Sequence, residues 1–213
     1  MNPWATLSAE APFILETDRP PVTDFNKKRR AFTRYWIHTG RTPEPRLGPV
    51  DAPIVLLQLN ASYDQQKREK PLTPSEIAKN MDNLANEDSA HPCLAESNQW
   101  WDSAFGQLIK KFDRKRLANR VCSIEYFAYP SARFGHKALQ IPSQCYQLSL
   151  VQRALDRGSI IIVTRGLDLW AEKIPGIRPK LGKTVFESIN RQRVWLTSGN
   201  LSSKAFNALC EAI

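Results

Sequence analysis

The sequence predicts an α/β protein, folded as a three-layer α/β/α sandwich with a central four-stranded parallel sheet. Four short apolar runs have the character of buried strands, and helical stretches lie between them. The runs cover residues 54–59, 120–127, 159–164 and 193–197. The first three are apolar without clean alternation, which is typical of strands covered on both faces of a parallel sheet. Strands that alternate with helices favour right-handed βαβ crossovers.

The clearest helical patterns lie between and after these strands. Residues 100–112 and 143–158 have helical periodicity, and a last helix over 202–213 follows the fourth strand. Ser143 suits the N-cap of the second of these helices, and Gly158 suits its C-terminal stop. These helices supply the covering layers that the apolar strands require.

The N-terminal quarter is expected to be less regular than the rest. Residues 1–22 contain four prolines and no clear period, so they predict an irregular arm. A helix is expected over 24–40, capped by Thr23 or Asp24, with its aromatic side chains facing the core. Prolines predict an extended connector over 41–53. The expected organisation is therefore an arm and helix over residues 1–50, packed on a domain formed by residues 51–213.

Charge favours a polyanionic partner. The chain has 213 residues, with 30 Lys plus Arg against 21 Asp plus Glu, so its net charge is +9. Such an excess favours a polyanionic partner such as nucleic acid. No apolar run approaches the roughly 20 residues that span a bilayer, and no export signal is visible. We expect a cytoplasmic monomer without a membrane interaction.

The cysteines and histidines do not have the spacing of a metal site. Four cysteines occur without a CxxC pair, and three histidines are scattered without an HxH or HExxH spacing. We therefore expect reduced, mostly buried thiols, and neither a metal nor a cofactor.

The best site signal is the set of segments that follow the predicted strands. In an open parallel sheet, ligands bind outside the carboxyl ends of the strands. The segments 60–64, 128–133, 165–168 and 198–202 carry polar, aromatic or glycine residues, whereas the strands are mostly apolar. The sequence therefore predicts a pocket at this rim of the sheet.

Two polar residues stand out near that rim. Glu125 lies inside an apolar strand, and a buried carboxylate requires an ion pair, a ligand or solvent. Asn60 ends the first strand, where it either caps the following loop or belongs to a site.

The motifs at the strand ends resemble those of the uracil-DNA glycosylase superfamily, in its divergent branches. The first motif reads Leu-Gln-Leu-Asn-Ala-Ser-Tyr over 57–63, and the last reads Thr-Ser-Gly-Asn-Leu-Ser over 197–202. The segment 125–131, Glu-Tyr-Phe-Ala-Tyr-Pro-Ser, is similar to the segment with which family members read the base. The resemblance covers residues 50–213. Ala61 stands where the family has proline, and Thr197 stands where it has histidine.

The resemblance implies hydrolysis of the bond between a flipped base and deoxyribose by a monofunctional DNA glycosylase. Asn60 would orient the water, and Asp64 would be a stronger base than an amide, although an exposed loop acid is the competing interpretation. Ser62, Tyr63, Glu125 and Tyr126 would bind the base. Leu201 would enter the duplex as a wedge, or else begin the last helix as a core residue. The expected DNA contacts are Ser131, Arg133, Arg165, Ser198, Gly199, Asn200, Leu201 and Ser202.

Glu125 gives the most specific hypothesis about the substrate. A carboxylate accepts hydrogen bonds, so it suits an exocyclic amine and disfavours the carbonyl edge of uracil. The predicted base is therefore modified and of the cytosine type, in base-excision repair or in defence against phage DNA. The basic runs, such as Lys110–Lys111, are interpreted either as phosphate contacts or as a solvated helix face.

Two other classes of function remain open. A catalytically decayed nucleic-acid-binding module on the same fold would explain Ala61 and Thr197. A nucleotide-binding α/β enzyme is disfavoured, because the chain contains neither GxGxxG nor GxxxxGK[ST].

Overall fold

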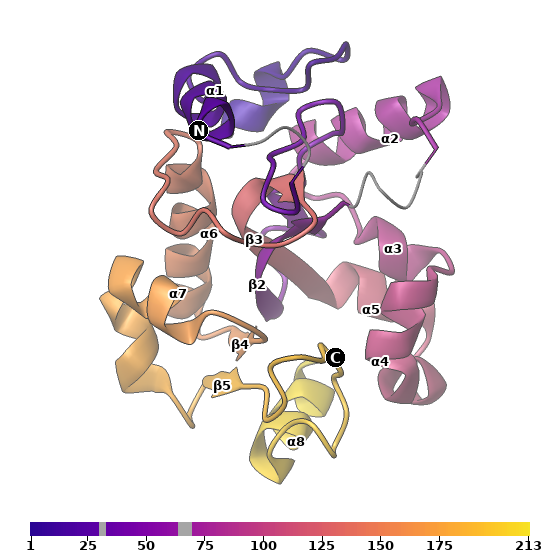
Figure 1. Cartoon of the computed structure of the whole chain (residues 1–213). Helices are drawn as coiled ribbons and strands as arrows, with labels where there is room; N and C mark the ends of the chain where they lie inside the picture. The colour runs from indigo at the N-terminus through magenta and orange to yellow at the C-terminus, as the bar shows by residue number, and fades with distance from the viewer. Residues whose placement is uncertain (30–32, 64–69) are drawn as a thin grey trace. The chain divides into compact units, whose positions relative to one another are not determined.

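The protein is described by a computed structural model that covers residues 1–29, 33–63 and 70–213 (Figure 1). These residues form an α/β protein with an open, mostly parallel sheet of five strands in the order β1-β3-β2-β4-β5. The strands are Arg46–Leu47 (β1), Ile54–Ser62 (β2), Val121–Ser131 (β3), Ile160–Val163 (β4) and Val185–Glu187 (β5). The α/β class is confirmed, and the expected four-stranded sheet is corrected to five strands.

Helices connect the strands. The α-helices are Arg19–Lys27 (α1), Pro74–Ala85 (α2), Pro92–Ala95 (α3), Gln99–Lys111 (α4), Arg114–Arg120 (α5), Gln144–Arg157 (α6), Leu167–Lys173 (α7) and Ser203–Ala212 (α8). Short 3₁₀ segments cover Pro3–Thr6 (η1) and Pro175–Lys180 (η3). The predicted helices over 100–112, 143–158 and 202–213 correspond to α4, α6 and α8 and are confirmed. Gly158 ends α6 at a φ of 76°, as a C-terminal glycine should.

The chain divides into two compact units, each assembled from three separate segments. Unit 1 contains residues 1–46, 59–86 and 125–147, and unit 2 contains residues 47–58, 87–124 and 148–213. Both β2 and β3 begin in unit 2 and continue into unit 1. The N-terminal segment thus shares its unit with the carboxyl ends of these two strands. The division of the chain near residue 50 stays a prediction.

The predicted helix over 24–40 is wrong. Helix α1 begins at Arg19, earlier than expected, because Pro20 and Pro21 suit its first turn, and it ends at Lys27. Its buried side chain is Val22, whereas Phe25 is only half-buried. Asn26 donates to the Ile37 carbonyl at 2.9 Å and accepts from the Ile37 amide at 3.0 Å, which fixes residue 37 in a non-helical return segment. Phe32 lies outside the described residues, and Trp36 is half-buried.

The predicted fourth strand over 193–197 is also wrong. That segment has no strand pairing, and the strand beside β4 is β5, with Val163 in register with Glu187. The amide of Leu196 donates instead to the Ala104 carbonyl in α4 at 2.9 Å. Alternating Val194 and Leu196 are buried, so the segment has the burial pattern of a strand but packs as an extended loop.

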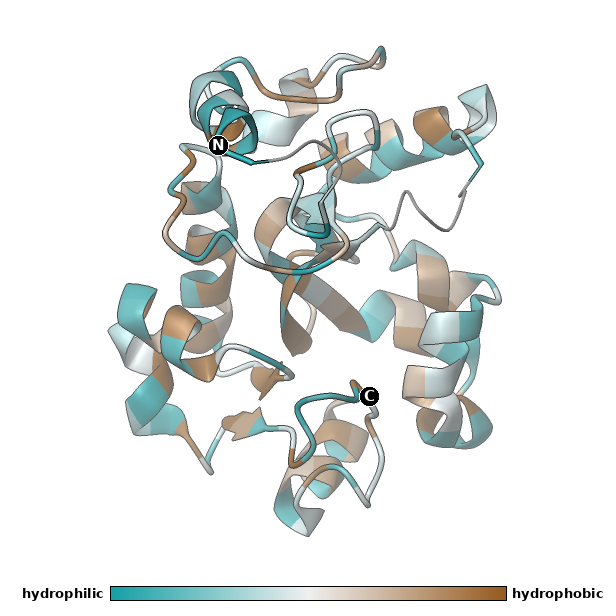
Figure 2. Cartoon of the chain, in the orientation of Figure 1, coloured by the Kyte–Doolittle hydropathy of each residue, from teal (hydrophilic) through white to brown (hydrophobic). Residues whose placement is uncertain are grey.

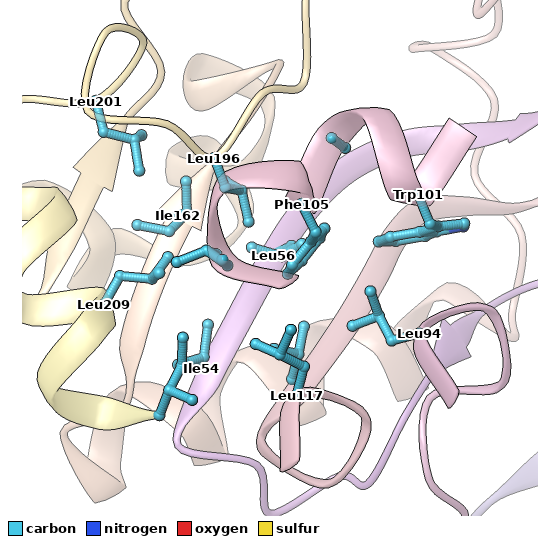
Figure 3. Packing of buried hydrophobic residues seen from close by; sticks show 14 of the residues in the cluster. Ile54, Leu56, Leu94, Trp101, Phe105, Leu117, Ile162, Leu196, Leu201 and Leu209 are labelled. Atoms are coloured by element: carbon cyan, nitrogen blue, oxygen red, sulfur yellow. The ribbon is translucent and has the colours of Figure 1, made fainter. Parts of the chain in front are cut away.

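The core of unit 2 lies on one face of its strands (Figure 3). Ile54 and Leu56 of β2, with Ile162 of β4, pack against side chains of α3, α4, α5 and α8. The alternate residues Val55 and Leu57 are also completely buried, so the strands are covered on both faces, as their apolar runs predict. In Figure 2, β4 and β5 are accordingly coloured as hydrophobic.

Unit 1 is organised around a buried acid. The Tyr129 hydroxyl donates to Asp18 at 2.8 Å, and the Ser143 amide donates to the other carboxylate oxygen at 3.0 Å. The Tyr129 oxygen in turn accepts from the Leu15 amide at 3.2 Å. Burial, followed by the charge of Asp18, raises the pKa of Tyr129. These bonds join the N-terminal segment to β3 and to the start of α6.

Gly48 is required by close backbone packing. Its φ is 101°, and a Cβ placed there would lie 2.2 Å from the Val121 carbonyl oxygen. We predict that Gly48→Ala lowers the free energy of unfolding by about 2–4 kcal/mol, because a left-handed alanine is strained and the clash is with backbone. Urea unfolding measures the change. The matched control is Gly106→Ala in α4, where an added Cβ would have no atom within 4 Å. This substitution should raise the free energy of unfolding by about 1 kcal/mol, because alanine has the higher helix propensity. Equal effects of the two substitutions would contradict this account.

The buried His91 should make unit 2 sensitive to acid. Burial lowers the pKa of His91 to about 3, and its ring packs 4.3 Å from Trp101. At a pH below the ordinary histidine pKa, His91 binds a proton in the unfolded chain but not in the folded chain. This group should therefore cost about 2 kcal/mol of stability as the pH falls from about 6.5 to 5. Urea unfolding across this range should show a slope that His91→Gln reduces by about one proton, and an unchanged slope would contradict the prediction.

Candidate functional site

The carboxyl ends of β2 and β3 are joined by one amide side chain. Nδ2 of Asn60 donates to the carbonyl and to the hydroxyl of Ser131, both at 3.0 Å. It also donates to the carbonyl of Ala61, the next residue in the chain, at 2.8 Å. Ser131 is completely buried, and its hydroxyl donates to the Arg133 carbonyl at 3.0 Å. Since these bonds all use Nδ2, they fix the plane of the amide, in which Oδ1 is the acceptor atom.

Tyr63 follows Asn60 by three positions, and two side chains of unit 1 contact its ring. The His38 ring meets it edge to face, with centroids 4.7 Å apart, and the Arg41 guanidinium carbon lies 5.0 Å from its centroid. The backbone of Tyr63 donates to the Ser131 carbonyl at 3.4 Å. Ser62 is exposed next to it. Asp64, the predicted stronger base, lies outside the described residues.

Charged residues occur in the segments that adjoin this cluster, which consists of Asn60, Tyr63 and Ser131. Arg34 and Arg133 are both exposed, and the Arg133 amide donates to the Arg34 carbonyl at 2.7 Å. Neither forms an ion pair with any residue that the structure describes. Glu44 is half-buried, and burial raises its pKa against the opposing charge of Arg41. Two exposed cations without an ion pair among the described residues thus adjoin the cluster.

The predicted base-reading residues Glu125 and Tyr126 lie away from this cluster. The expected strand ended at 127, but β3 continues to Ser131. Six residues of extended strand separate Glu125 from Ser131, or about 20 Å at the usual rise. Glu125 is buried and its amide donates to the Pro45 carbonyl, while the Tyr126 ring packs 6.1 Å from Phe134. The two side chains are therefore placed in the interior rather than at the end of β3.

The loop 197–202 belongs to unit 2 and does not follow a strand. Asn200 is buried, accepts from the Asn190 amide at 2.7 Å, and donates to the carbonyls of Arg193 and Trp195 at 2.9 and 3.0 Å. All of these bonds stay within the 190–200 segment, so Asn200 shapes the loop and does not present its amide to a ligand.

The other residues of that loop are divided between structural and exposed positions. Leu201 is 1% exposed within the unit 2 core, which corrects the wedge prediction in favour of the core interpretation (Figure 3). Ser202 caps α8 through the Ala205 amide at 3.2 Å. Ser198 and Gly199 are exposed, and Ser198 exchanges two hydrogen bonds with Gln107 of α4.

Arg165 follows β4, as predicted, and it lines a cavity that sequence reasoning missed. Its guanidinium donates to the carbonyls of Arg191 and Gln192, both at 3.0 Å. The cavity has a volume of about 180 Å³ and is lined by Trp100, Ser103, Ala104, Arg165, Gln192, Arg193, Val194 and Trp195. The signal in the sequence is an arginine and a tryptophan two positions apart, Arg193 and Trp195, within a segment that the apolar pattern predicts as a buried strand.

The described part of the chain contains no cluster of side chains suited to binding a metal ion. Groups of three or more His, Cys, Asp or Glu side chains suited to a metal ion do not occur there. The cysteines are free thiols, but only Cys122 is buried; Cys93 and Cys210 are half-buried and Cys145 is exposed, so the expectation of mostly buried thiols is corrected. Within the described ranges, no helix is both long and apolar enough to cross a membrane.

Comparison of the chain with protein-family models, with curated proteins and with solved structures finds no match.

The core position of Leu201 leads to a prediction that separates packing from DNA contact. Leu201→Ala should lower the free energy of unfolding by about 2–5 kcal/mol, because it leaves a cavity among buried side chains. Urea unfolding measures this, and Leu201→Met, which conserves volume, should cost less than about 1.5 kcal/mol. A folded, equally stable Leu201→Ala protein with weakened DNA binding would restore the wedge interpretation.

Proposed function

We propose that the protein is a monofunctional DNA glycosylase that hydrolyses the N-glycosidic bond of a flipped base, in repair or in defence against phage DNA. The observation that carries the proposal is the fixed amide of Asn60 at the ends of β2 and β3, whose acceptor, the Ser131 carbonyl, also accepts from the Tyr63 amide. The Tyr63 ring is in turn contacted by His38 and Arg41. An oriented amide and an aromatic wall are what water placement and base flipping require.

The reaction needs little covalent chemistry from the protein. The C1′–N bond breaks with its electron pair on the departing base, and water supplies the oxygen of the new C1′–O bond. Oδ1 of Asn60 would hold that water, whose proton passes to Asp64 or to solvent, while the base takes a proton from solvent. Tyr63 would wall off the base. Arg34 and Arg133 would hold the flanking phosphates. The negative charge of these phosphates, and not the charge of the arginines, would stabilise an oxocarbenium-like sugar.

The base itself stays a prediction. The cytosine-type assignment depends on the Glu125 side chain reaching the base, and about 20 Å of extended backbone separates residue 125 from Ser131. Glu125→Gln should therefore leave the choice of base unchanged. The experiment is to incubate the protein with duplexes containing uracil, 5-methylcytosine, hydroxymethylcytosine or its glucosylated form, and to detect released base by mass spectrometry.

The role of Asn60 can be measured on whichever base is released. Asn60→Ala removes the fixed amide and should lower the single-turnover rate by about 10²- to 10³-fold, the usual loss for one oriented polar group. The matched control is Asn119→Ala, which removes an exposed amide that donates to the Lys115 carbonyl in α5. Equal rates for Asn60→Ala and the wild type would remove Asn60 from the reaction.

A non-catalytic nucleic-acid-binding module is the second candidate, and one observation favours it. Asn200 and Leu201, which the resemblance places in the reaction's last motif, are both buried and engaged within unit 2. Salt-dependent DNA binding by the wild type without release of any base from the panel would support this second function instead of the first.

A further inference from the structure

Unit 2 carries two exposed tryptophans that line the same small cavity. The side chains of Trp100 and Trp195 are 48% and 36% exposed, in a chain whose other large aromatic residues are mainly buried or half-buried among the described positions. Both contribute to the 180 Å³ cavity together with Arg165 and Arg193. Burial of an exposed aromatic ring is favourable, and a binding partner can supply it. Two exposed tryptophan rings at one cavity therefore indicate a binding surface.

The position of Trp100 is fixed by the start of α4. The Asn98 side chain caps the helix by accepting from the amides of Trp100 and Trp101 at 3.2 and 3.3 Å. The Trp100 ring then meets the Trp101 ring edge to face, with centroids 4.9 Å apart. Trp101 is itself buried against His91 and Phe105. Trp100 is therefore an exposed ring supported from below by the core.

The position of Trp195 is fixed by the loop that Asn200 shapes. Asn200 donates to the carbonyls of residues 193 and 195, and the Leu196 amide bonds α4 immediately after the ring. The Arg193 guanidinium carbon lies 4.4 Å from the centre of the Trp195 ring. A second planar cation, Arg165, is held in place by the carbonyls of residues 191 and 192.

The described residues that line this cavity give it a positive charge. Arg165 and Arg193 form no ion pair with a residue in the described part of the chain, and no acidic side chain lines the cavity. Two tryptophan rings with two guanidinium groups form the arrangement that binds unpaired bases: the rings stack on the base, and the arginines neutralise the flanking phosphates or stack in turn. The cavity is smaller than the roughly 300 Å³ at which pockets for drug-sized ligands begin, and it is suited to a single ring system.

We propose that the cavity between Trp100 and Trp195 is a stacking site for one unpaired nucleobase of single-stranded DNA. The inference deepens the proposed function, because it names the part of the DNA that unit 2 binds. It is independent of base hydrolysis, since it uses none of Asn60, Tyr63 or Ser131. Asn200 is a positioning residue, because its side chain holds the loop that carries Trp195.

The experiment measures binding of fluorescent oligothymidylate to the full chain by anisotropy, together with quenching of tryptophan fluorescence. Trp195→Ala and Trp100→Ala should each weaken binding by about 5- to 150-fold, the equivalent of about 1–3 kcal/mol for one stacked base. Trp195→Phe should retain most of the affinity because it keeps a ring. The matched control is Ile189→Ala, which removes an apolar side chain that is 68% exposed in the same loop region but does not line the cavity.

A second probe separates stacking from phosphate binding. An oligonucleotide of the same length built from abasic tetrahydrofuran units has the phosphates without the bases, and it should bind as weakly to the wild type as oligothymidylate binds to Trp195→Ala. Equal wild-type affinity for the two probes, or tryptophan variants that bind oligothymidylate like the wild type, would overturn the proposal. Tighter binding of oligouridylate would assign the cavity to RNA and overturn the DNA assignment.

The two proposals fail separately. Base-dependent binding that Trp195→Ala abolishes, without release of any base, leaves the stacking site in place and removes the glycosylase. Base release that the tryptophan variants do not alter, with unchanged oligothymidylate binding, leaves the glycosylase and removes the stacking site.

Discussion

The hydrogen bonds from Asn60 to Ser131 are the constraint on which the proposed site depends. β2 and β3 are apolar strands whose side chains are buried for most of their length, and such strands carry no chemistry of their own. One amide ties their carboxyl ends together, at the point where the side chains become polar. Because Nδ2 has three oxygen acceptors within 3.0 Å, the side chain has little freedom to rotate. A catalytic group needs that loss of freedom, since an amide orients water and does not deprotonate it.

The sequence predicts the buried halves of the strands better than their ends. Runs such as Ile54–Leu57 have one interpretation, because continuous apolar residues must be covered on both faces. The end of β3 is harder, since Tyr129, Pro130 and Ser131 resemble a turn. The hydrogen bond from the Tyr129 hydroxyl to the buried Asp18, more than a hundred residues away, keeps the strand extended. Because β3 ends four residues later than expected, Glu125 lies six positions from the end of the strand instead of two.

Two other errors have the same physical origin. Residues 24–40 have helical periodicity, but Asn26 bonds both backbone groups of Ile37, and this contact between distant residues is not visible in a local pattern. Residues 193–197 alternate like a strand, and their buried members do face inward, yet their backbone is bonded by α4 and by Asn200. A buried strand over these residues would also bury Trp195, so the local pattern does not indicate that its ring is exposed at a cavity. By contrast, the stop at Gly158 was predictable, since it depends on neighbours in the chain. The cap at Ser202 depends equally on its neighbours, although the resemblance implied a DNA contact for that residue.

The most direct test of the account is a crystal structure of the protein bound to DNA that contains an abasic site, at a resolution that shows ordered water. The account predicts that the abasic sugar lies at the Asn60–Ser131 junction, with a water molecule within hydrogen-bond distance of Asn60 Oδ1 and directed at C1′. DNA bound with its abasic sugar elsewhere, and with the Asn60 amide remote from it, would contradict the assignment of this junction as the catalytic site.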